Sequence, residues 1–463
     1  MPSNEQHRPP SPLRIVEITG LFGDRDVTIE VAPKPITLLF GQNGAGKSTA
    51  LRVIAQMLGP AIAGLPQEPL ATAKLTFDDK AVMTYSSGPP ARWEEIRPDG
   101  TTHGDELPDL AAVDADPGFK HFIEQETPYL WRDGRLIGPS LAGRSIPESF
   151  LNSLRTRYRK WLMTQPRMEG KDIAKTATDG RELKRDCFLI SSDRLVSIDG
   201  RVSLEGRVGF PTAPIGIRPL RGRFAEHDAD VVAEIASDLR DRIRDARQES
   251  SKQSWQLDGS FIKRAAAIPE DEDPLSPAQR ETLIDQIREL QGRMVNCALA
   301  ASSAEIPAFP GDSKEVKKFL DLYLRDLLDK AKTSLPVLPK LELFEEILNS
   351  HFTDKSTQLS LDSGLSIVRR SSKVPIPLDR LSSGERHLIV LFHHLIFMTK
   401  PGGLCLIDEP EISLHVDWQE RFIDSVAKVA EVSPQQYLIA THSPSIVGKH
   451  YDLMRDVKGV MIA

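Results

Sequence analysis

The start of the chain alternates apolar and polar stretches in the order strand, strand, strand, loop, helix. Residues 13–18 and 26–31 alternate apolar and polar side chains, which predicts two paired strands. Residues 36–40 form a continuous apolar run, typical of a strand buried inside a sheet. The run stops at Gly41, and apolar residues return at helical spacing over 48–58. This pattern predicts a glycine loop between a buried strand and a helix.

The middle of the chain is mainly helical in its pattern. A hairpin over 74–87 is expected to extend the first sheet, and residues 87–145, rich in proline, glycine and aspartate, predict irregular surface structure. Five segments then carry apolar residues at helical spacing: 145–163, 229–247, 277–294, 313–331 and 341–352. No heptad pattern persists for three or four repeats, so a long coiled-coil arm is not expected.

Strand character returns near the end of the chain. Residues 357–362 and 365–370 predict a hairpin, 386–397 a helix, and 402–409 and 435–442 two buried strands. An apolar strand with a polar turn over 187–198 interrupts the helical region. The expected organisation is a disordered 1–12, a first part of an α/β domain at 13–90, a mainly helical insertion at 91–352 from which 186–198 returns to that domain, and a second part at 353–463.

The loop after the third strand satisfies the phosphate-loop pattern G-x-x-x-x-G-K-[ST]. Its glycines let backbone N–H groups approach a polyphosphate, and the helix that follows adds partial positive charge. Lys47 is expected to hold the β and γ phosphates, and Ser48 to bind Mg²⁺. The alternative is a glycine turn that matches by chance. The candidate nucleotide-binding residues of this loop are Asn43, Gly44, Ala45, Gly46, Lys47, Ser48 and Thr49.

Two acidic residues end the apolar strand at 402–409. Such a strand delivers Asp408 to the Mg²⁺ shell, while Glu409 can polarise a water in line with the γ-phosphate. Strands that end in acids are common, so this signal gains force only from the phosphate loop that precedes it. Asp408 is the candidate metal ligand beside Ser48, and Glu409 a candidate catalytic residue.

The segment Leu381-Ser382-Ser383-Gly384-Glu385 precedes the acidic strand and resembles the LSGGQ signature of the ABC superfamily. Physically it is a second anion site, because a hydroxyl and small residues stand at a helix N-terminus. The alternative is a plain helix cap in which Ser382 or Ser383 satisfies free N–H groups.

Two further segments continue the same order of motifs. Residues 411–415 resemble the D-loop of that superfamily, and His442, at the end of an apolar strand, stands where the family has its switch histidine. A lone histidine at a strand end is usually structural. After the preceding motifs, His442 is interpreted as a sensor of the γ-phosphate and a second catalytic candidate.

Together these elements resemble an ABC-type ATPase of the SMC, RecF and OLD group. The resemblance covers 13–60 and 357–450 and implies an α/β P-loop ATPase head, a mixed sheet flanked by helices, with a large, mainly helical insertion. It also implies ATP and Mg²⁺ as cofactors and a homodimer or higher homo-oligomer, in which Lys47 of one copy and Ser382 and Gly384 of another clamp one ATP. Three strings look most like standalone anti-phage ATPases such as Septu and PARIS: LSSGERHLIVLFHHLIF, LIDEPEISLHVDWQ and IATHSP.

The chain departs from that family pattern in two places. His387 stands where related proteins often have glutamine, and no clear Q-loop glutamine follows the first lobe. The turn 191–194 lies where that loop is expected. Arg194 in this turn is read equally as part of the loop or as a structural salt-bridge partner.

Composition narrows the range of functions. The chain has 463 residues, 40% of them hydrophobic and 27% charged, with a net charge of -7, so it has no overall basic field for nucleic acid or anionic lipid. Three scattered cysteines argue against disulfides and a cysteine zinc site, which favours the cytoplasm, and no apolar run predicts a membrane span.

The leading hypothesis is a sensor ATPase of an anti-phage system that controls a separate effector, a toxin or nuclease, because no nuclease domain is recognised in this chain. The alternatives are a RecF-like or SMC-like DNA-binding ATPase, and a protein that keeps ATP only as structural glue. Contact with nucleic acid through a local arginine cluster stays open, against the more common reading of a solvated surface. The cluster comprises Arg201, Arg207, Arg218, Arg221 and Arg223.

Overall fold

The computed structural model describes the chain in segments that form two compact units, each presented by itself. The described residues are 11–41, 44–58, 69–88, 91–107, 119–121, 130–132, 135–137, 187–190, 224–303, 306, 313–412 and 414–461. The first unit comprises 1–194, 399–412 and 433–463, and the second comprises 195–398 and 413–432. This division differs from the expected domain boundaries, because 353–398 falls in the second unit.

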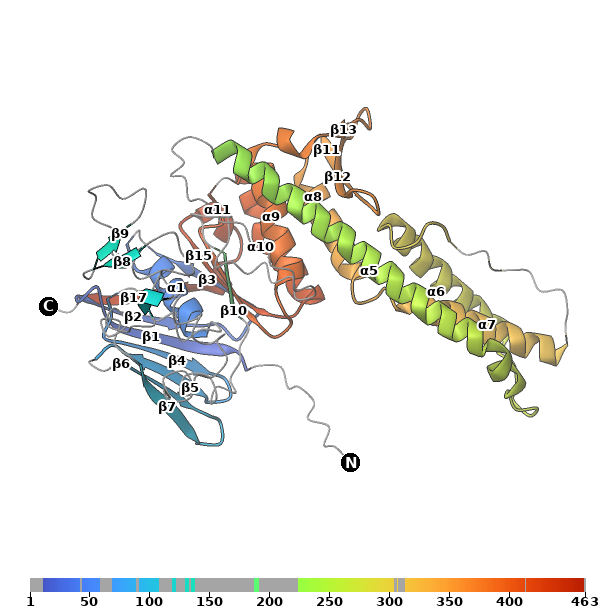
Figure 1. Cartoon of the computed structure of the whole chain (residues 1–463), viewed down its shortest axis with the longest axis horizontal. Coiled ribbons are helices and arrows are strands. Elements are labelled where there is room, and N and C mark those ends of the chain that lie inside the picture. The colour runs from blue at the N-terminus through green and yellow to red at the C-terminus, as the bar shows by residue number, and fades with distance from the viewer. Residues whose placement is uncertain are drawn as a thin grey trace. The chain divides into compact units, whose positions relative to one another are not determined.

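A five-stranded parallel sheet lies at the centre of the first unit (Figure 1). Its order is β10 (Cys187–Ile190), β14 (Leu404–Asp408), β15 (Gln436–Thr441), β3 (Ile36–Phe40) and β16 (Met454–Asp456). Every residue of β14 and β15 is buried, as expected for strands covered on both faces. The strand expected within 187–198 is present as β10, which runs parallel to β14.

A seven-stranded antiparallel sheet forms the other layer of this unit. Its order is β17 (Lys458–Met461), β2 (Arg25–Glu30), β1 (Leu13–Leu21), β4 (Thr72–Phe77), β5 (Val82–Ser86), β6 (Ala91–Ile96) and β7 (Thr102–Leu107). The pairing of β1 with β2 and of β4 with β5 confirms the two hairpins expected from the alternating pattern. A separate small hairpin joins β8 (Leu130–Arg132) to β9 (Arg135–Ile137).

The expectation of irregular structure over 87–145 is wrong for residues 91–107, which extend the antiparallel sheet as β6 and β7. Trp93 and Glu95 are both buried on one face of β6, so a buried carboxylate hides the period of two that marks a strand. The turn between the strands contains Gly100 at φ +83°, and Gly100 N donates to Arg97 O at 2.9 Å. The Asp-Gly pair in this segment marks a hairpin turn.

The core of the first unit lies between its two sheets. Helix α1 (Lys47–Leu58) contributes Leu51, Val53 and Ile54 to an apolar cluster shared by both layers, with strand residues such as Val16 and Leu406. These side chains are fully removed from water and supply the hydrophobic driving force for this arrangement. Two short elements follow β15, namely α11 (Pro444–Val447) and η3 (Tyr451–Leu453).

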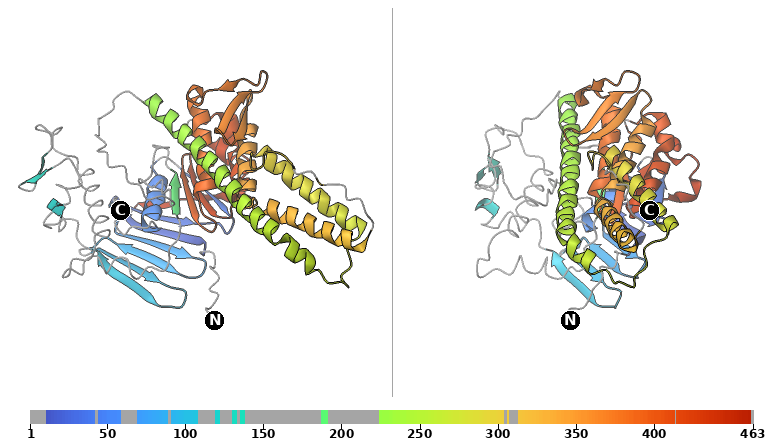
Figure 2. Two further views of the ribbon diagram at one scale, coloured as in Figure 1. Left: turned by 45° about the vertical axis from the view of Figure 1, so that its right-hand side comes forward. Right: turned by 90° about the vertical axis from the view of Figure 1, so that its right-hand side faces the viewer.

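Long helices dominate the second unit, and α5, α6 and α7 lie side by side in Figures 1 and 2. Its helical elements are α5 (Phe224–Ala266), α6 (Pro277–Asn296), α7 (Lys314–Lys332), α8 (Leu338–His351), η1 (Leu378–Arg380), α9 (Ser383–His393), η2 (His394–Met398) and α10 (Val416–Val432). The sequence predicted a helix only over 229–247, whereas α5 runs for 43 residues. Its extension was missed because Trp255 and Ile262 stay 82% and 77% exposed, which breaks the apolar stripe.

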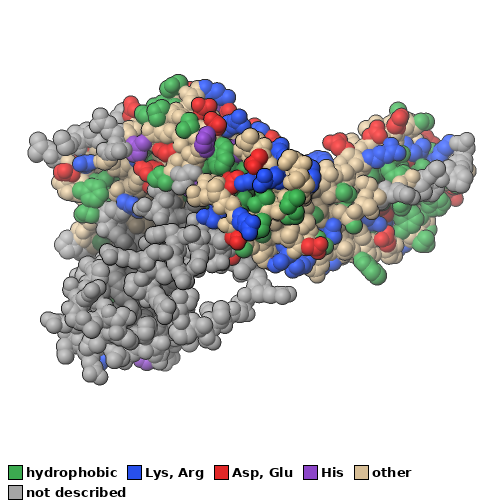
Figure 3. Space-filling model, turned by 90° about the horizontal axis from the view of Figure 1, so that it is seen from above, with side chains coloured by type: hydrophobic (Ala, Val, Ile, Leu, Met, Phe, Trp, Pro, Cys, Tyr) green, Lys and Arg blue, Asp and Glu red, His purple; other side chains and the backbone are tan. Residues whose placement is uncertain are grey.

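The helices of the second unit are held by apolar and ionic contacts. Ile287, Leu324 and Leu327 form the buried cluster between α6 and α7. Arg280 and Asp321 form an ion pair at 2.7 Å across the same two helices. On the face seen in Figure 3, Lys and Arg side chains are interspersed with Asp and Glu along these helices.

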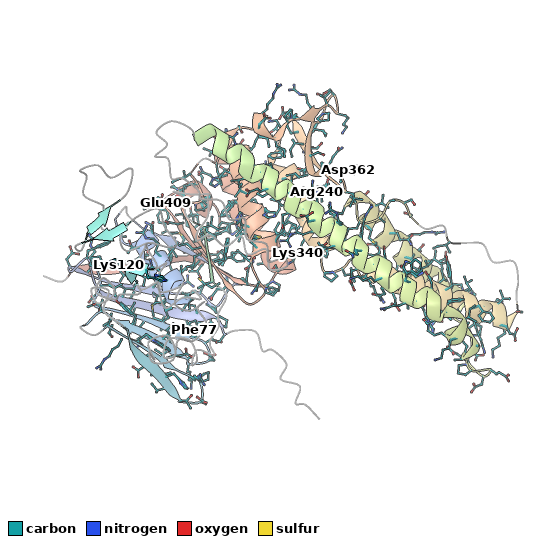
Figure 4. The ribbon with its side chains drawn as sticks, viewed as in Figure 1. Phe77, Lys120, Arg240, Lys340, Asp362 and Glu409 are labelled. Atoms are coloured by element: carbon teal, nitrogen blue, oxygen red, sulfur yellow. The ribbon has the colours of Figure 1, made fainter. Side chains whose placement is uncertain are left out.

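A three-stranded antiparallel sheet completes the second unit, in the order β11 (Lys355–Ser360), β12 (Gly364–Arg369) and β13 (Pro375–Ile376). The hairpin between β11 and β12 was expected, and its turn packs against α5. Gly364 has φ +68°, and a Cβ on it would lie 1.8 Å from the Ala236 carbonyl oxygen and 2.7 Å from Arg240 N. Arg240 and Asp362 mark the two sides of this approach in Figure 4. Only glycine fits there.

Several expected features lie outside the described residues: the helix at 145–163, residues 1–10 of the disordered N-terminus, the turn 191–194 and the five arginines between 201 and 223. Among the residues that are described, no helix combines the length and apolar character needed to cross a membrane.

Gly364→Ala should destabilise the second unit by about 3 kcal/mol or more, because the added Cβ meets the α5 backbone and the left-handed conformation adds strain. Gly259→Ala is the matched control: Gly259 lies in α5 with no atom within 4 Å of an added Cβ, so the change should stabilise by up to about 1 kcal/mol. Denaturant unfolding of both variants measures the difference. Equal effects would contradict the close approach.

Candidate functional site

Three loops meet at one edge of the parallel sheet in the first unit. The register pairs Asp408 with Ala440 and Thr441 with Phe40, so β14, β15 and β3 end side by side. The carboxyl ends of adjacent parallel strands are where α/β proteins build their ligand sites. This register brings together side chains from residues 44–48, 408–411 and 441–443.

The phosphate loop and the acidic strand touch through one hydrogen bond. Ser48 Oγ donates to Asp408 Oδ1 at 2.8 Å. Both residues were expected as Mg²⁺ ligands, and the structure brings their oxygens into direct contact. Thr49, a further candidate, is buried in α1, and its Oγ1 accepts from Arg52 at 3.3 Å.

The shape of the phosphate loop depends on two glycines in left-handed conformations. Gly44 has φ +80° and Gly46 has φ +87°, values that side chains rarely allow. A Cβ on Gly46 would also lie 3.3 Å from Leu21 of the neighbouring sheet. Arg25, on β2, donates to the Gly44 carbonyl oxygen and ties the loop to that sheet. This role of Arg25 could not be predicted from the sequence, since β2 carries no nucleotide motif.

Lys47 is folded into the loop and is only 4% exposed. Its Nζ donates to the Gly41 carbonyl oxygen at 2.8 Å and lies 3.2 Å from His442 Nδ1. Burial lowers the pKa of Lys47, while the carboxylates of Glu409, Asp408 and Glu411 act in the opposite direction. The site thus surrounds one lysine with three acids, an excess of negative charge that a bound cation would relieve.

The two acids that end β14 differ in their surroundings. Asp408 is 7% exposed, and burial raises its pKa even though Ser48 donates to it. Glu409, labelled in Figure 4, has φ +48°, a strained conformation for a side chain of this size. Its backbone N donates to Ala440 O at 2.8 Å, which holds the strained turn in place. Strain of this kind concentrates at functional sites.

The His442 ring contacts both halves of the site. Nε2 lies 3.4 Å from Glu409 Oε1, and Nδ1 faces the Lys47 ammonium. An ammonium only donates, so this contact needs a tautomer in which Nδ1 accepts, and the ring N–H of that tautomer is on Nε2, the nitrogen on the Glu409 side. The expected sensor histidine therefore bridges the phosphate-loop lysine and the candidate catalytic carboxylate.

Glu411 joins the site in a way that the motif analysis did not foresee. Its Oε1 accepts from the backbone N of His442 at 2.7 Å and of Ser443 at 3.1 Å. Residues 411–415 were read only as a D-loop. The signal available in the sequence was a third acid, two residues after Glu409.

The signature segment belongs to the second unit and is described there by itself. Ser382 is the N-cap of α9, and its Oγ accepts from Glu385 N at 3.3 Å, while the Glu385 carboxylate accepts from Ser382 N at 2.8 Å. This is a capping box, so Ser382 does cap the helix, a role that is compatible with an anion site at the same helix N-terminus. Lys355 forms an ion pair with Glu385 at 2.5 Å. Burial raises the pKa of Glu385, but the bonds from Lys355 and Ser382 outweigh it and leave that pKa lowered.

An open pocket in the same unit has the signature on one wall and the segment before α10 on the other. Trp418, on α10, is fixed there by a hydrogen bond from Nε1 to His351 O at 2.9 Å. The pocket is lined by Thr353, Ser382, Gly384, Glu385, Leu414, His415, Asp417 and Trp418. Ser383 starts α9, and Asn43 of the phosphate loop lies outside the described residues.

A parallel sheet, a phosphate loop on a helix N-terminus and acids at the end of β14 define an α/β P-loop ATPase fold. Two family models match the chain, an AAA ATPase domain over residues 230–447 and an AAA domain over 14–82.

Known relatives match parts of the chain. The chromosome partition protein Smc of Rhodopseudomonas palustris is 26% identical over 246 residues, which is 48% of this chain and 20% of Smc. The zinc import ATP-binding protein ZnuC of Yersinia pestis is 32% identical over 118 residues, 24% of this chain and 43% of ZnuC. The matches thus span less than half the length of these relatives, and they support an ATP-binding protein of the SMC/ABC type.

Solved structures with similarity include two SMC heads. The Smc head domain of Pyrococcus furiosus, crystallised with an extended coiled coil and bound to ScpA, aligns over 97% of this chain and 96% of that one, with 15% identity and a TM-score of 0.34. The SMC head of Thermotoga maritima aligns over 97% and 99%, with 13% identity and a TM-score of 0.33.

Lys47→Ala should weaken ATP binding by about 10²-fold or more, because the phosphate loop loses the ammonium that lies within it. Calorimetry with ATP measures the dissociation constant. Lys74→Ala, which removes an exposed lysine paired with Glu17 in the same unit, is the control and should bind as the wild type does. An unchanged affinity in Lys47→Ala would refute the assignment of the loop.

Proposed function

We propose that this chain binds ATP with Mg²⁺ and hydrolyses it at composite sites shared between two copies. The observation that carries the proposal is the continuous set of contacts from Ser48 to Asp408 and from Lys47 through His442 to Glu409. These contacts join the groups that phosphoryl transfer requires: a phosphate cradle, a metal ligand pair, a carboxylate beside the water path and a sensor.

Each of these side chains has a distinct task in the proposed reaction. Lys47 leaves Gly41 O and His442 to hold the β and γ phosphates. Glu409 orients the attacking water and accepts the proton that the water loses as it attacks. Once Lys47 has moved away, His442 turns so that a ring N–H donates to the γ-phosphate, and the same ring then reports whether that phosphate is present.

The residues present fit a Mg²⁺ ion bound together with ATP. Mg²⁺ prefers oxygen ligands and usually takes only one or two from the protein, the rest from phosphates and water. Ser48 Oγ and Asp408 Oδ1 are two such oxygens 2.8 Å apart, and the surplus of acids around Lys47 favours a cation. Among the described residues, no three or more His, Cys, Asp or Glu side chains are grouped so as to hold a metal ion. When bound, the ion neutralises charge on the β and γ phosphates.

The signature of a second copy completes the site in this proposal. Ser382 and Gly384 lie at the N-terminus of α9 and line an open pocket of the second unit. One chain therefore carries two separate anion sites, which two copies arranged head to tail would combine. Dimer formation is then coupled to ATP, and hydrolysis releases it.

For the biological role we favour a sensor ATPase of an anti-phage system that acts on a separate toxin or nuclease. The motif strings around Leu381, Asp408 and His442 support this reading. The similarity to Smc favours the alternative, a DNA-binding ATPase of the SMC or RecF kind. The neighbouring genes discriminate between them: a small toxin or nuclease reading frame favours defence, and replication genes favour DNA maintenance.

Glu409→Gln should still bind ATP but hydrolyse it about 10²-fold to 10³-fold more slowly, because the amide cannot take a proton from the attacking water. The closed dimer should also live longer. Steady-state ATPase and size-exclusion chromatography with ATP measure the two effects. Full turnover in this variant would remove Glu409 from the mechanism, and an equally slow wild type would favour ATP as structural glue.

Mixing two inactive variants tests the shared site. Ser382→Arg blocks the signature and Lys47→Ala removes the phosphate cradle, so each homodimer has no complete site. A mixed dimer has one site with both parts intact and should regain partial ATPase activity. The ATPase activity of the mixture is compared with that of each variant alone at equal total protein, after mixed dimers have been shown to form. If the activity of the mixture is no greater than the mean of the two variants, the site lies within one chain.

A further inference from the structure

The loops that follow β14 and β15 are joined to each other by several hydrogen bonds. Glu409 N donates to Ala440 O at 2.8 Å, and Ile412 N donates back to Glu409 O at 3.1 Å, which closes a tight turn. This turn places the Glu411 side chain against the loop that carries His442. Both loops belong to the first unit.

The backbone of the histidine loop needs an acceptor at this point. β15 ends at Thr441, so the N–H groups of His442 and Ser443 lie beyond the end of the strand. Glu411 Oε1 accepts both, at 2.7 and 3.1 Å, and Thr441 Oγ1 also accepts from Ser443 N, at 3.0 Å. A charged acceptor makes such bonds stronger than a neutral one does.

We propose that Glu411 is a positioning residue, which fixes the peptide that carries His442 and so holds the imidazole between Lys47 and Glu409. This inference rests on the proposed ATPase function and adds a residue to it. The ring itself makes only longer contacts, 3.2 Å to Lys47 Nζ and 3.4 Å to Glu409 Oε1, which leaves its orientation to the backbone. Glu411 does not touch the reacting atoms.

A purely electrostatic role is the competing explanation. The Glu411 carboxylate also acts on Lys47 and on Asp408, raising the pKa of each, so its charge alone affects the site. The two roles separate by substitution. Gln keeps an acceptor oxygen at the same reach without the charge, whereas Asp keeps the charge but ends one methylene short of the two N–H groups.

The experiment compares Glu411→Ala, Glu411→Gln and Glu411→Asp in the full-length protein. We expect kcat to fall about 10²-fold in the Ala and Asp variants, since displacing a catalytic group by about 1 Å lowers the rate by a factor of that order. The Gln variant should stay within about 3-fold of the wild type. The Kd for a non-hydrolysable ATP analogue should change by less than about 3-fold in all three. Glu17→Ala, which removes an exposed carboxylate of the same unit, is the control and should match the wild type.

Two outcomes overturn the proposal. If the Gln variant is as slow as the Ala variant while the Asp variant stays active, the effect comes from the charge of Glu411. If the Kd values rise in step with the loss of kcat, the effect comes from nucleotide binding. Hydrogen exchange of the backbone N–H groups of His442 and Ser443, without nucleotide, decides the point even if the wild type fails to hydrolyse ATP. Faster exchange in Glu411→Ala but not in Glu411→Gln supports the tether, and unchanged exchange refutes it.

Discussion

The parallel register of β14, β15 and β3 is the constraint on which the whole candidate site depends. It aligns Asp408 with Ala440 and Thr441 with Phe40, so three loops that are far apart in the chain leave the sheet at one edge. A shift of one residue in either pairing would reverse the faces of these buried strands and separate Ser48 from Asp408. The packing of α1 against both sheets fixes that register, because its apolar side chains are shared by the two layers.

The site is held in place by bonds that a nucleotide would exchange. Ser48 donates to Asp408, and Lys47 contacts Gly41 O and His442. The side chains of Ser48, Asp408 and Lys47 therefore each have a partner within the site. Such pre-organisation lowers the cost of rearrangement when charge develops in a reaction. The strained φ of Glu409 fits this view, since the hydrogen bond to Ala440 holds a conformation that the free residue would avoid.

The second unit fixes the signature helix from its other end. His393, the last residue of α9, lies 2.8 Å from Asp238 on α5, and Arg242 binds the same carboxylate at 2.6 Å. Burial would raise the pKa of Asp238, but His393 and Arg242 lower it to about 2. Together with the close approach of Gly364 to Ala236, the hydrogen bond between His393 and Asp238 ties the long helix α5 to the helix that begins at Ser382.

The sequence by itself determined the motifs and the local structure that carries them. The buried strands ending at Phe40, Asp408 and Thr441, the glycine loop and the helix after Lys47 all follow from short-range patterns, because burial on both faces and left-handed glycines leave local signals. Only the tertiary structure decided which loops meet. The tethers from Arg25 and Glu411 depend on partners that are distant in the chain, and such contacts leave no periodic trace in the sequence. The hairpin at 91–107 contains a buried charge, and the second half of α5 lacks a continuous apolar stripe, so the usual periodic signal is missing from both.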